Sequence, residues 1–186
     1  MNEREWVQQI VAKLHESLAG AVLLVEQARK IPYSYEVLEY QTSGKVRTRP
    51  MRYETDILIS ERLSHDAMKP RVIIEAKIRS VTTHDAITYS QKAAAHKQVH
   101  PYLRYGIILG ARRHYPLPGR LFRHGANFDF MQSFVAFEPS SEEWTRFLET
   151  IGKEVEYSKL LEEIILNSRS RNRKAFTTLQ KALDLR

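Results

Sequence analysis

The spacing of hydrophobic residues predicts that the chain begins with a helix and continues into strands. An apolar residue recurs every four positions over residues 4–18, which is the spacing of the buried face of an amphipathic helix. Residues 21–30 are ambiguous between a helix and a strand, and we favour a second helix there. Alternating or continuously apolar runs then predict strands at residues 33–41, 53–60 and 71–78.

The second half of the chain alternates helices that carry capping signals with short apolar strands. Thr82 and Asp85 have the spacing of a capping box, so we expect a helix over residues 83–99. Ser140 and Glu143 repeat this signal for a helix that starts near residue 141, and one or two further helices fill the segment to residue 186. Two apolar runs predict further strands at residues 105–111 and 128–137.

This order of elements indicates an α/β fold with a mixed central β-sheet flanked by helices and a helical C-terminal extension. The sequence has no internal repeat, low-complexity tract or linker-like stretch. We therefore expect a single domain over residues 1–186. Its α/β core occupies residues 1–138, and residues 139–186 form a helical part of the same domain.

Composition narrows the class of protein. The 186 residues carry 29 Lys and Arg against 22 Asp and Glu, a formal charge of +7, and no Cys. The lack of Cys excludes disulfides, thiolate zinc sites and cysteine nucleophiles, and it fits a cytoplasmic protein. The longest apolar runs are far shorter than the ~18 residues of a spanning helix, and the first residues lack a signal-peptide pattern, so we expect no membrane association.

The basic charge is unevenly distributed. Residues 169–186 hold six basic residues against one acid, and residues 101–125 and 45–52 hold five and four basic residues with no acid. Residues 141–168 are acidic, with seven Glu against three basic residues. We expect DNA along the basic clusters and a protein partner on the acidic helices, while ordinary solvated faces are the alternative. The candidate DNA contacts are Arg47, Arg49, Arg104, Arg112, Arg113, Arg120 and Arg123.

Three charged residues lie in strands that are otherwise apolar. Glu75 and Lys77 leave the same face of their strand, because side chains alternate. Asp56 lies in the preceding apolar strand, and if the two strands pair as a hairpin Asp56 lies beside Glu75. Two carboxylates suit Mg²⁺, and an ammonium stabilises charge on an attacked phosphate. The alternative is a structural salt bridge between Glu75 and Lys77 or their neighbours.

Asp56, the run Glu75-Ala76-Lys77 and the helix that follows resemble the PD-(D/E)XK nuclease superfamily, which has the restriction-endonuclease-like fold. The resemblance covers about residues 4–111, and Thr55 stands where the family name has Pro. It implies that Asp56 and Glu75 hold Mg²⁺ and that Lys77 assists the attacking water. The implied products carry a 5′-phosphate and a 3′-hydroxyl.

The same resemblance implies two further site residues. A glutamine often lies on the helix after the third strand, and Gln91 is the candidate for it. An acid on the first helix often completes such sites, and Glu16 is the candidate, with Glu26 and Glu39 as alternatives.

The whole chain resembles the small catalytic subunit of a heterodimeric type IIS restriction endonuclease. This resemblance implies that the substrate is double-stranded DNA and that a larger partner recognises the sequence and cuts the other strand. Two alternatives stay open: a non-catalytic nucleic-acid or partner-binding module on a nuclease fold, and a junction resolvase or repair nuclease. The pair His96 and His100 is interpreted as surface or phosphate-contacting rather than as a zinc site.

Overall fold

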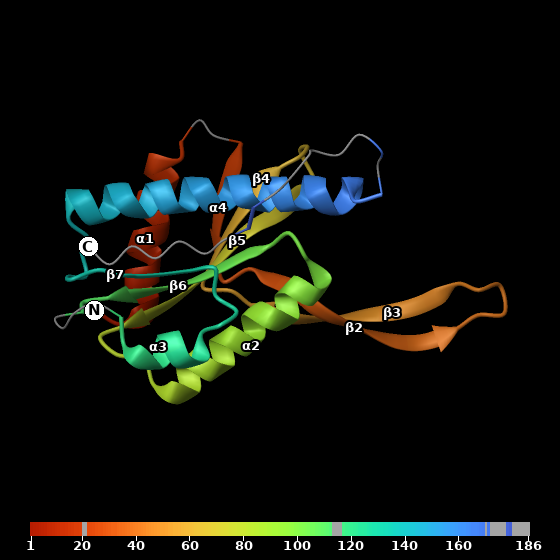
Figure 1. Cartoon of the computed structure of the whole chain (residues 1–186), viewed down its shortest axis with the longest axis horizontal. Coiled ribbons are helices and arrows are strands. Elements are labelled where there is room, and N and C mark those ends of the chain that lie inside the picture. The colour runs from red at the N-terminus through yellow and green to blue at the C-terminus, as the bar shows by residue number, and fades with distance from the viewer. Residues whose placement is uncertain (20–21, 113–116, 170, 172–177, 180–186) are drawn as a thin grey trace.

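The computed structural model describes residues 1–19, 22–112, 117–169, 171 and 178–179. One helix is followed by five strands, after which helices and strands alternate (Figure 1). In chain order the elements are α1 (Glu3–Ser17), β1 (Leu23–Gln27), β2 (Lys30–Tyr40), β3 (Val46–Glu54), β4 (Ile57–Arg62), β5 (Met68–Ile78), α2 (Thr83–Val99), β6 (Arg104–Gly110), α3 (Gly119–His124), β7 (Phe130–Ser133) and α4 (Ser141–Asn167).

Five of the strands form one mixed sheet in the order β1-β4-β5-β6-β7. The β1–β4 and β4–β5 pairs are antiparallel, whereas β5–β6 and β6–β7 are parallel. The two parallel pairs are joined through α2 and α3, as parallel neighbours require a crossover. The predicted mixed α/β fold with a central sheet flanked by helices is confirmed, and β5 is the middle strand of that sheet.

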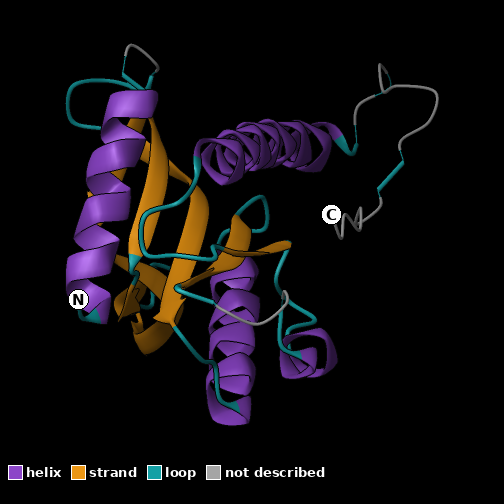
Figure 2. Cartoon of the chain, turned by 90° about the vertical axis from the view of Figure 1, so that its left-hand side faces the viewer, coloured by secondary structure: helices purple, strands orange, loops and turns teal. Residues whose placement is uncertain are grey.

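The alternation of side chains along β5 divides the core into two layers. Val72, Ile74 and Ala76 pack with residues of α1 and α4 on one face of the sheet. Ile73 and the inward residues of β6 pack against α2 and α3 on the other face. Figure 2 shows the sheet lying between α1 and α2, and Figure 1 shows α4 on the side opposite α2 and α3. Glu75 and Lys77 share the parity of Ile73 and therefore belong to the α2 side.

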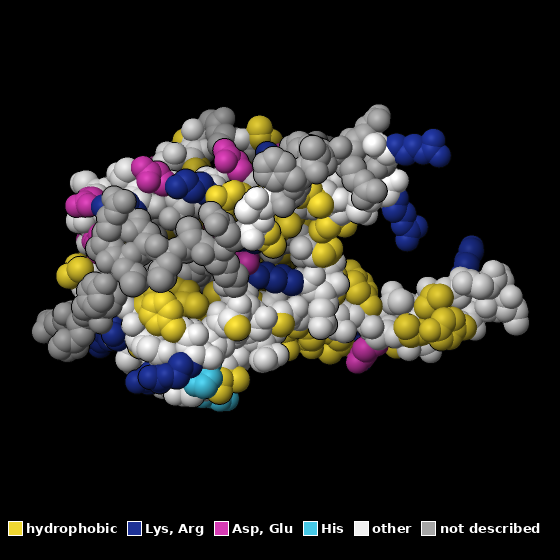
Figure 3. All heavy atoms as spheres, viewed as in Figure 1, with side chains coloured by type: hydrophobic (Ala, Val, Ile, Leu, Met, Phe, Trp, Pro, Cys, Tyr) yellow, Lys and Arg dark blue, Asp and Glu magenta, His cyan; other side chains and the backbone are white. Residues whose placement is uncertain are grey.

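Strands β2 and β3 pair only with each other and form a two-stranded projection, here called the arm (residues 30–54). It extends well beyond the central sheet (Figure 1) and turns at Gly44, which has a positive φ of 84°. Its outer part exposes hydrophobic side chains, which Figure 3 shows on its surface; they include Tyr35, Val37, Leu38, Tyr40 and Val46.

Most of the predicted helices and strands are found, with three differences. The expected helix over residues 21–30 is wrong, because residues 23–27 form strand β1, paired with β4 and anchored by the buried Val25. The expected strand over residues 53–60 is divided by Thr55 and Asp56 into the end of β3 and strand β4. Strand β3 and helix α3 were not predicted. The capping boxes at Thr82 and Ser140 are both present.

Within the described ranges, no helix combines the length and the apolar character that crossing a membrane requires.

Candidate active site

The hairpin of β4 and β5 brings Asp56 and Glu75 together. Ile57 lies opposite Ile74 in the antiparallel register, so the residues one step outward, Asp56 and Glu75, are also opposite each other. The Asp56 carboxylate accepts a hydrogen bond from the backbone N–H of Ala76 at 2.8 Å, which fixes it against β5. The predicted pairing of these two strands, and the proximity of the two carboxyl groups, is therefore confirmed.

Glu75 is a buried carboxyl group in a partly charged environment. Its side chain accepts a hydrogen bond from the Tyr105 hydroxyl, and Lys92 Nζ lies 3.7 Å from its Oε1 atom. Burial and the nearby charge of Asp56 raise the pKa of Glu75 to about 7, while Lys92 and the Tyr105 hydroxyl oppose the rise. Because this pKa is close to neutral pH, a positive charge placed beside Glu75 would shift the carboxyl group toward its ionised form.

Lys77 lies at the end of β5, between α1 and α2. Its Nζ atom is 3.0 Å from Oε1 of Glu3 and 5.3 Å from the centre of the Tyr89 ring. Burial disfavours the ammonium, but the hydrogen bonds to Tyr89 and Glu3 outweigh that effect, and the pKa of Lys77 is raised. Lys77 is therefore charged and held against Glu3, two residues after Glu75 on the same face of β5.

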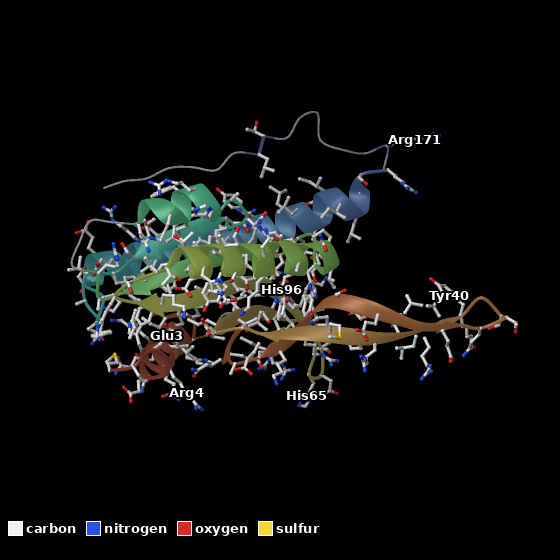
Figure 4. The ribbon with its side chains drawn as sticks, turned by 90° about the horizontal axis from the view of Figure 1, so that it is seen from below. Glu3, Arg4, Tyr40, His65, His96 and Arg171 are labelled. Atoms are coloured by element: carbon white, nitrogen blue, oxygen red, sulfur yellow. The ribbon has the colours of Figure 1, made fainter. Side chains whose placement is uncertain are left out.

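The first helix contributes Glu3 to this site rather than Glu16. Glu16 is exposed and lies thirteen residues further along α1, about 20 Å away along the helix axis. Figure 4 shows Glu3 at the beginning of the helix, where α1 approaches the end of β5. The assignment of Glu16 is corrected for this reason: the helix reaches the site with its first turn, and Glu16 belongs to its last.

Gln91 is likewise on the wrong face of its helix. Ile87 and Gln98 lie four residues before and seven residues after it on the same face of α2, and both are exposed like Gln91 itself. The face of α2 that meets the sheet carries small buried residues, Ala86, Ser90 and Ala93. Beside that stripe, Tyr89 and Lys92 reach the site. Helix α2 therefore supplies an ammonium where the resemblance implied an amide.

Four residues of the site are not predicted from the sequence: Glu3, Tyr89, Lys92 and Tyr105. The small residues at i, i+4 and i+7 on α2 were a usable signal, because they mark the buried face and place Lys92 at its edge. Tyr105 begins a buried strand next to β5, and the parallel register sets it opposite Ile73, two residues before Glu75. Predicting that contact required the order of the strands in the sheet.

The two carboxyl groups fit a magnesium ion bound with few protein ligands. Among the described residues, no three His, Cys, Asp or Glu side chains group in a way that could hold a metal by themselves. Asp56 accepts the Ala76 N–H on one oxygen, Glu75 accepts the Tyr105 hydroxyl on one, and the two carboxyl groups lie within hydrogen-bonding reach of each other, where one ion could contact both. Mg²⁺ binds commonly through one or two carboxylates, with water and substrate phosphate as its other ligands.

His96 is not at the surface, which corrects its interpretation as a phosphate contact. The ring is fully buried and stacks on Tyr105 at a centroid distance of 5.8 Å. Its Nδ1 atom lies 3.1 Å from the Pro32 carbonyl oxygen at the base of the arm, and Nε2 is buried without a hydrogen-bond partner. His96 therefore joins α2 to the arm (Figure 4) from the core.

The candidate DNA contacts on β6 and just after it, Arg104 and Arg112, bond to other groups of the protein. Arg104 is nearly buried and pairs with Asp129 at 3.2 Å and with Glu154 at 2.5 Å. Arg112 donates a hydrogen bond to the Arg79 carbonyl oxygen at 3.0 Å. The expectation that Arg104 contacts DNA is corrected, because its guanidinium already balances two buried carboxylates.

Four of the other candidate arginines lie on exposed surfaces. Arg120 and Arg123 belong to α3, where Figure 3 shows basic and histidine side chains together. Arg47 and Arg49 lie on the arm and pair across its two strands with Glu39 at 3.0 Å and Glu36 at 2.6 Å. Arg113 lies outside the described residues, as do most of the basic residues between 169 and 186.

Glutamates of the acidic helix α4 form ion pairs with residues of the sheet. Glu154 pairs with Arg104, Glu162 pairs with Arg71 and Lys69, and Glu143 caps the helix. The acidic charge of residues 141–168 is therefore partly consumed by contacts with the sheet. These paired glutamates do not support the expectation that residues 141–168 form an acidic surface for a protein partner.

A scan of the chain against protein-family models found no matching family, and a search of curated protein sequences found no match.

Proposed function

We propose that this protein is a Mg²⁺-dependent DNA endonuclease subunit that hydrolyses a phosphodiester bond. The observation that carries the proposal is that Asp56 and Glu75 lie opposite each other on the α2 side of the sheet, with Lys77 two residues further along the same face of β5. Two carboxyl groups and one ammonium in a partly buried site are costly unless they bind or transform something.

Each residue has a role that follows from its surroundings. Asp56 and Glu75 would hold the ion, which when bound polarises the phosphate and lowers the pKa of a bound water. Lys77 would supply a positive charge at the end of the same strand, where it would stabilise negative charge developing on the attacked phosphate. Glu3 and Tyr89 hold that ammonium in position from two different helices.

The fold supports the same proposal at a finer level. We propose that the chain has the restriction-endonuclease-like fold; in support, Asp56 directly precedes β4 and Glu75-Ala76-Lys77 lies in the neighbouring strand β5, which a helix follows. Buried Thr55, in the position of the Pro in the family name, makes the bend that aims Asp56: its N–H and hydroxyl both donate to the Arg29 carbonyl oxygen at 3.0 Å.

We further propose that the chain is the catalytic small subunit of a heterodimeric type IIS restriction endonuclease. One site of this kind cuts one strand in each binding event, so a double-strand break requires a second site. A larger partner would supply this second site, which cuts the other strand, and would also recognise the DNA sequence. Arg120 and Arg123 are exposed and lie on α3, where they suit contacts with the phosphate backbone.

A nicking assay on supercoiled plasmid tests the proposal. The chain is incubated with Mg²⁺, alone and together with a candidate partner nuclease, beside the variants Asp56→Asn and Lys77→Ala. We expect Mg²⁺-dependent cleavage by the wild type and a loss of at least about a hundredfold in both variants. Lys153→Ala, which removes an exposed lysine of α4, is the control and keeps full activity. Equal cleavage by all four proteins would overturn the site, and cutting of branched DNA without a partner would point to a junction resolvase.

A further inference from the structure

Lys92 is a second ammonium in the candidate site, and its position is tightly defined. It projects from α2 toward the sheet, and its side chain is only 23% exposed. Its Nζ atom lies 5.0 Å from the centre of the Tyr89 ring and 5.6 Å from that of Tyr53. Cations lie favourably over aromatic faces at such distances. The two rings therefore hold the ammonium beside Glu75.

Glu75 needs a countercharge wherever it is ionised, because its side chain is 2% exposed. Lys92 is the cation found at its Oε1 atom, at 3.7 Å, whereas Lys77 pairs with Glu3. The ammonium of Lys92 and a metal ion bound to Glu75 would therefore compete for the same carboxylate. Two cations at one carboxyl group repel each other strongly in a site that excludes most of the solvent.

We propose that Lys92 is the resident countercharge of Glu75 in the metal-free protein and that a divalent cation displaces its ammonium on entering the site. The inference rests on the proposed metal site at Asp56 and Glu75. It makes metal binding an exchange of one cation for another rather than an addition. Lys92 is then a positioning residue that lowers metal affinity, and it keeps the empty site charged and ordered.

A purely structural role for Lys92 predicts a different result. If the ammonium only tied α2 to the sheet, its removal would destabilise the protein equally with and without metal. Competition instead predicts that removal weakens the metal-free protein and strengthens metal binding. The dependence on metal therefore separates the two roles.

The test measures Mg²⁺ binding by isothermal titration calorimetry at pH 8, and the midpoint of thermal unfolding in EDTA and in Mg²⁺. The proteins are wild type, Lys92→Met, Lys92→Gln and Lys92→Arg, with Lys153→Met as the matched control on the surface of α4. We expect the Met and Gln variants to bind Mg²⁺ roughly tenfold more tightly than the wild type, since a neighbouring charge of this kind is worth at least about that factor. Their unfolding midpoints fall in EDTA and recover in Mg²⁺, while the Arg and control variants behave as wild type.

Two outcomes overturn different parts of the argument. If the wild type and Lys92→Met bind Mg²⁺ with equal affinity, and Asp56→Asn abolishes that binding, the metal site stands and the competition is wrong. If neither the wild type nor any Lys92 variant binds Mg²⁺, the proposed function falls together with this inference. Should Lys92→Met fail to fold, Lys92→Gln gives the same comparison, because its amide keeps a hydrogen-bond donor near Glu75.

Discussion

The Nζ atom of Lys77 lies 3.0 Å from Oε1 of Glu3, and this contact joins the end of the central strand to the first turn of the first helix. The two residues are 74 positions apart in the chain. The contact gives α1 a direct effect on the site, because the helix that packs the opposite layer of the core also holds the ammonium in place.

Replacing Glu3 by Gln tests this relationship. The variant loses the charge that positions Lys77, so we expect the rate of plasmid nicking at saturating Mg²⁺ to fall by at least about tenfold, since small misplacements of catalytic groups are costly. The free energy of unfolding changes by less than about 1 kcal/mol, because the pair is partly exposed. Glu16→Gln on the same helix is the control and leaves the rate unchanged. The reverse pattern would restore Glu16 as the site acid of this helix.

His96 makes the protein sensitive to acid. Burial lowers the pKa of His96 to about 4. The folded state therefore resists a proton that the unfolded chain binds near pH 6.5, and stability is lost as pH falls from about 6.5 to 4. The loss approaches roughly 3 kcal/mol at most.

Urea unfolding at several pH values checks this expectation. His96→Phe keeps a ring stacked on Tyr105 and removes the titrating group, so its stability changes less between pH 6.5 and 4 than that of the wild type. His65→Phe, at a side chain that is 99% exposed, keeps the wild-type dependence. An identical slope in wild type and His96→Phe would contradict a neutral buried imidazole.

We expect substitution of Arg104 to affect stability and substitution of the α3 arginines to affect DNA binding. Arg104→Ala leaves Glu154 buried without its cation and leaves Asp129 paired with Lys97, and we expect a loss of about 3 kcal/mol or more in the free energy of unfolding. Arg120→Ala and Arg123→Ala leave stability unchanged but weaken DNA binding. They also reduce its salt dependence, by a slope of about one for each phosphate that the protein no longer neutralises.

Chemical denaturation and fluorescence anisotropy at several salt concentrations give the two readouts. A stable Arg104→Ala variant with impaired DNA binding would reinstate Arg104 as a residue that binds DNA. If combining Arg120→Ala with Arg123→Ala leaves the salt dependence of DNA binding unchanged, α3 does not contact DNA.

Gly110 allows α1 to pack closely on the end of β6. A Cβ atom at this position would lie 2.6 Å from ring atoms of Trp6, which is fully buried. Gly110→Ala therefore shifts α1 and costs about 1–3 kcal/mol of stability. It also lowers nicking activity, because Glu3 moves with the helix.

Gly152→Ala is the matched control for this substitution. Its Cβ atom meets nothing within 4 Å on the exposed side of α4, so the variant gains up to about 1 kcal/mol, as expected for Ala in a helix. Thermal unfolding of the two variants compares them directly. Equal stability of Gly110→Ala and wild type would show that α1 can move without cost.

The sequence predicted best what local contacts determine. The capping boxes at Thr82 and Ser140 place α2 and α4 to within a residue, because a cap is formed by neighbours three positions apart. Glu75 and Lys77 were recognisable because two charges on one side of an apolar strand need an explanation, and the short connection to Asp56 brought the second carboxylate with it. Residues 23–27 were assigned wrongly because so short a segment becomes a strand only through its pairing with β4.

The remaining site residues depend on contacts that no local pattern carries. Glu3 reaches Lys77 because α1 packs with its first turn at the end of β5. Lys92 reaches Glu75 because it lies beside the face of α2 that packs on the sheet. Arg104 looked like a free basic residue in the sequence. It is instead balanced by Asp129 and Glu154, which are 25 and 50 positions further along the chain.

We expect the strands of the arm to separate locally while the central sheet stays folded. The outer strands of the arm share hydrogen bonds only with each other, and a two-stranded hairpin alone is barely stable in water. Backbone amide protons between residues 36 and 48 should therefore exchange with solvent without unfolding of the central sheet. Cleavage by a protease near Gly44 would leave Asp56, Glu75 and Lys77 in place, because the base of the arm, where Tyr53 contacts Lys92, lies at the opposite end of the hairpin.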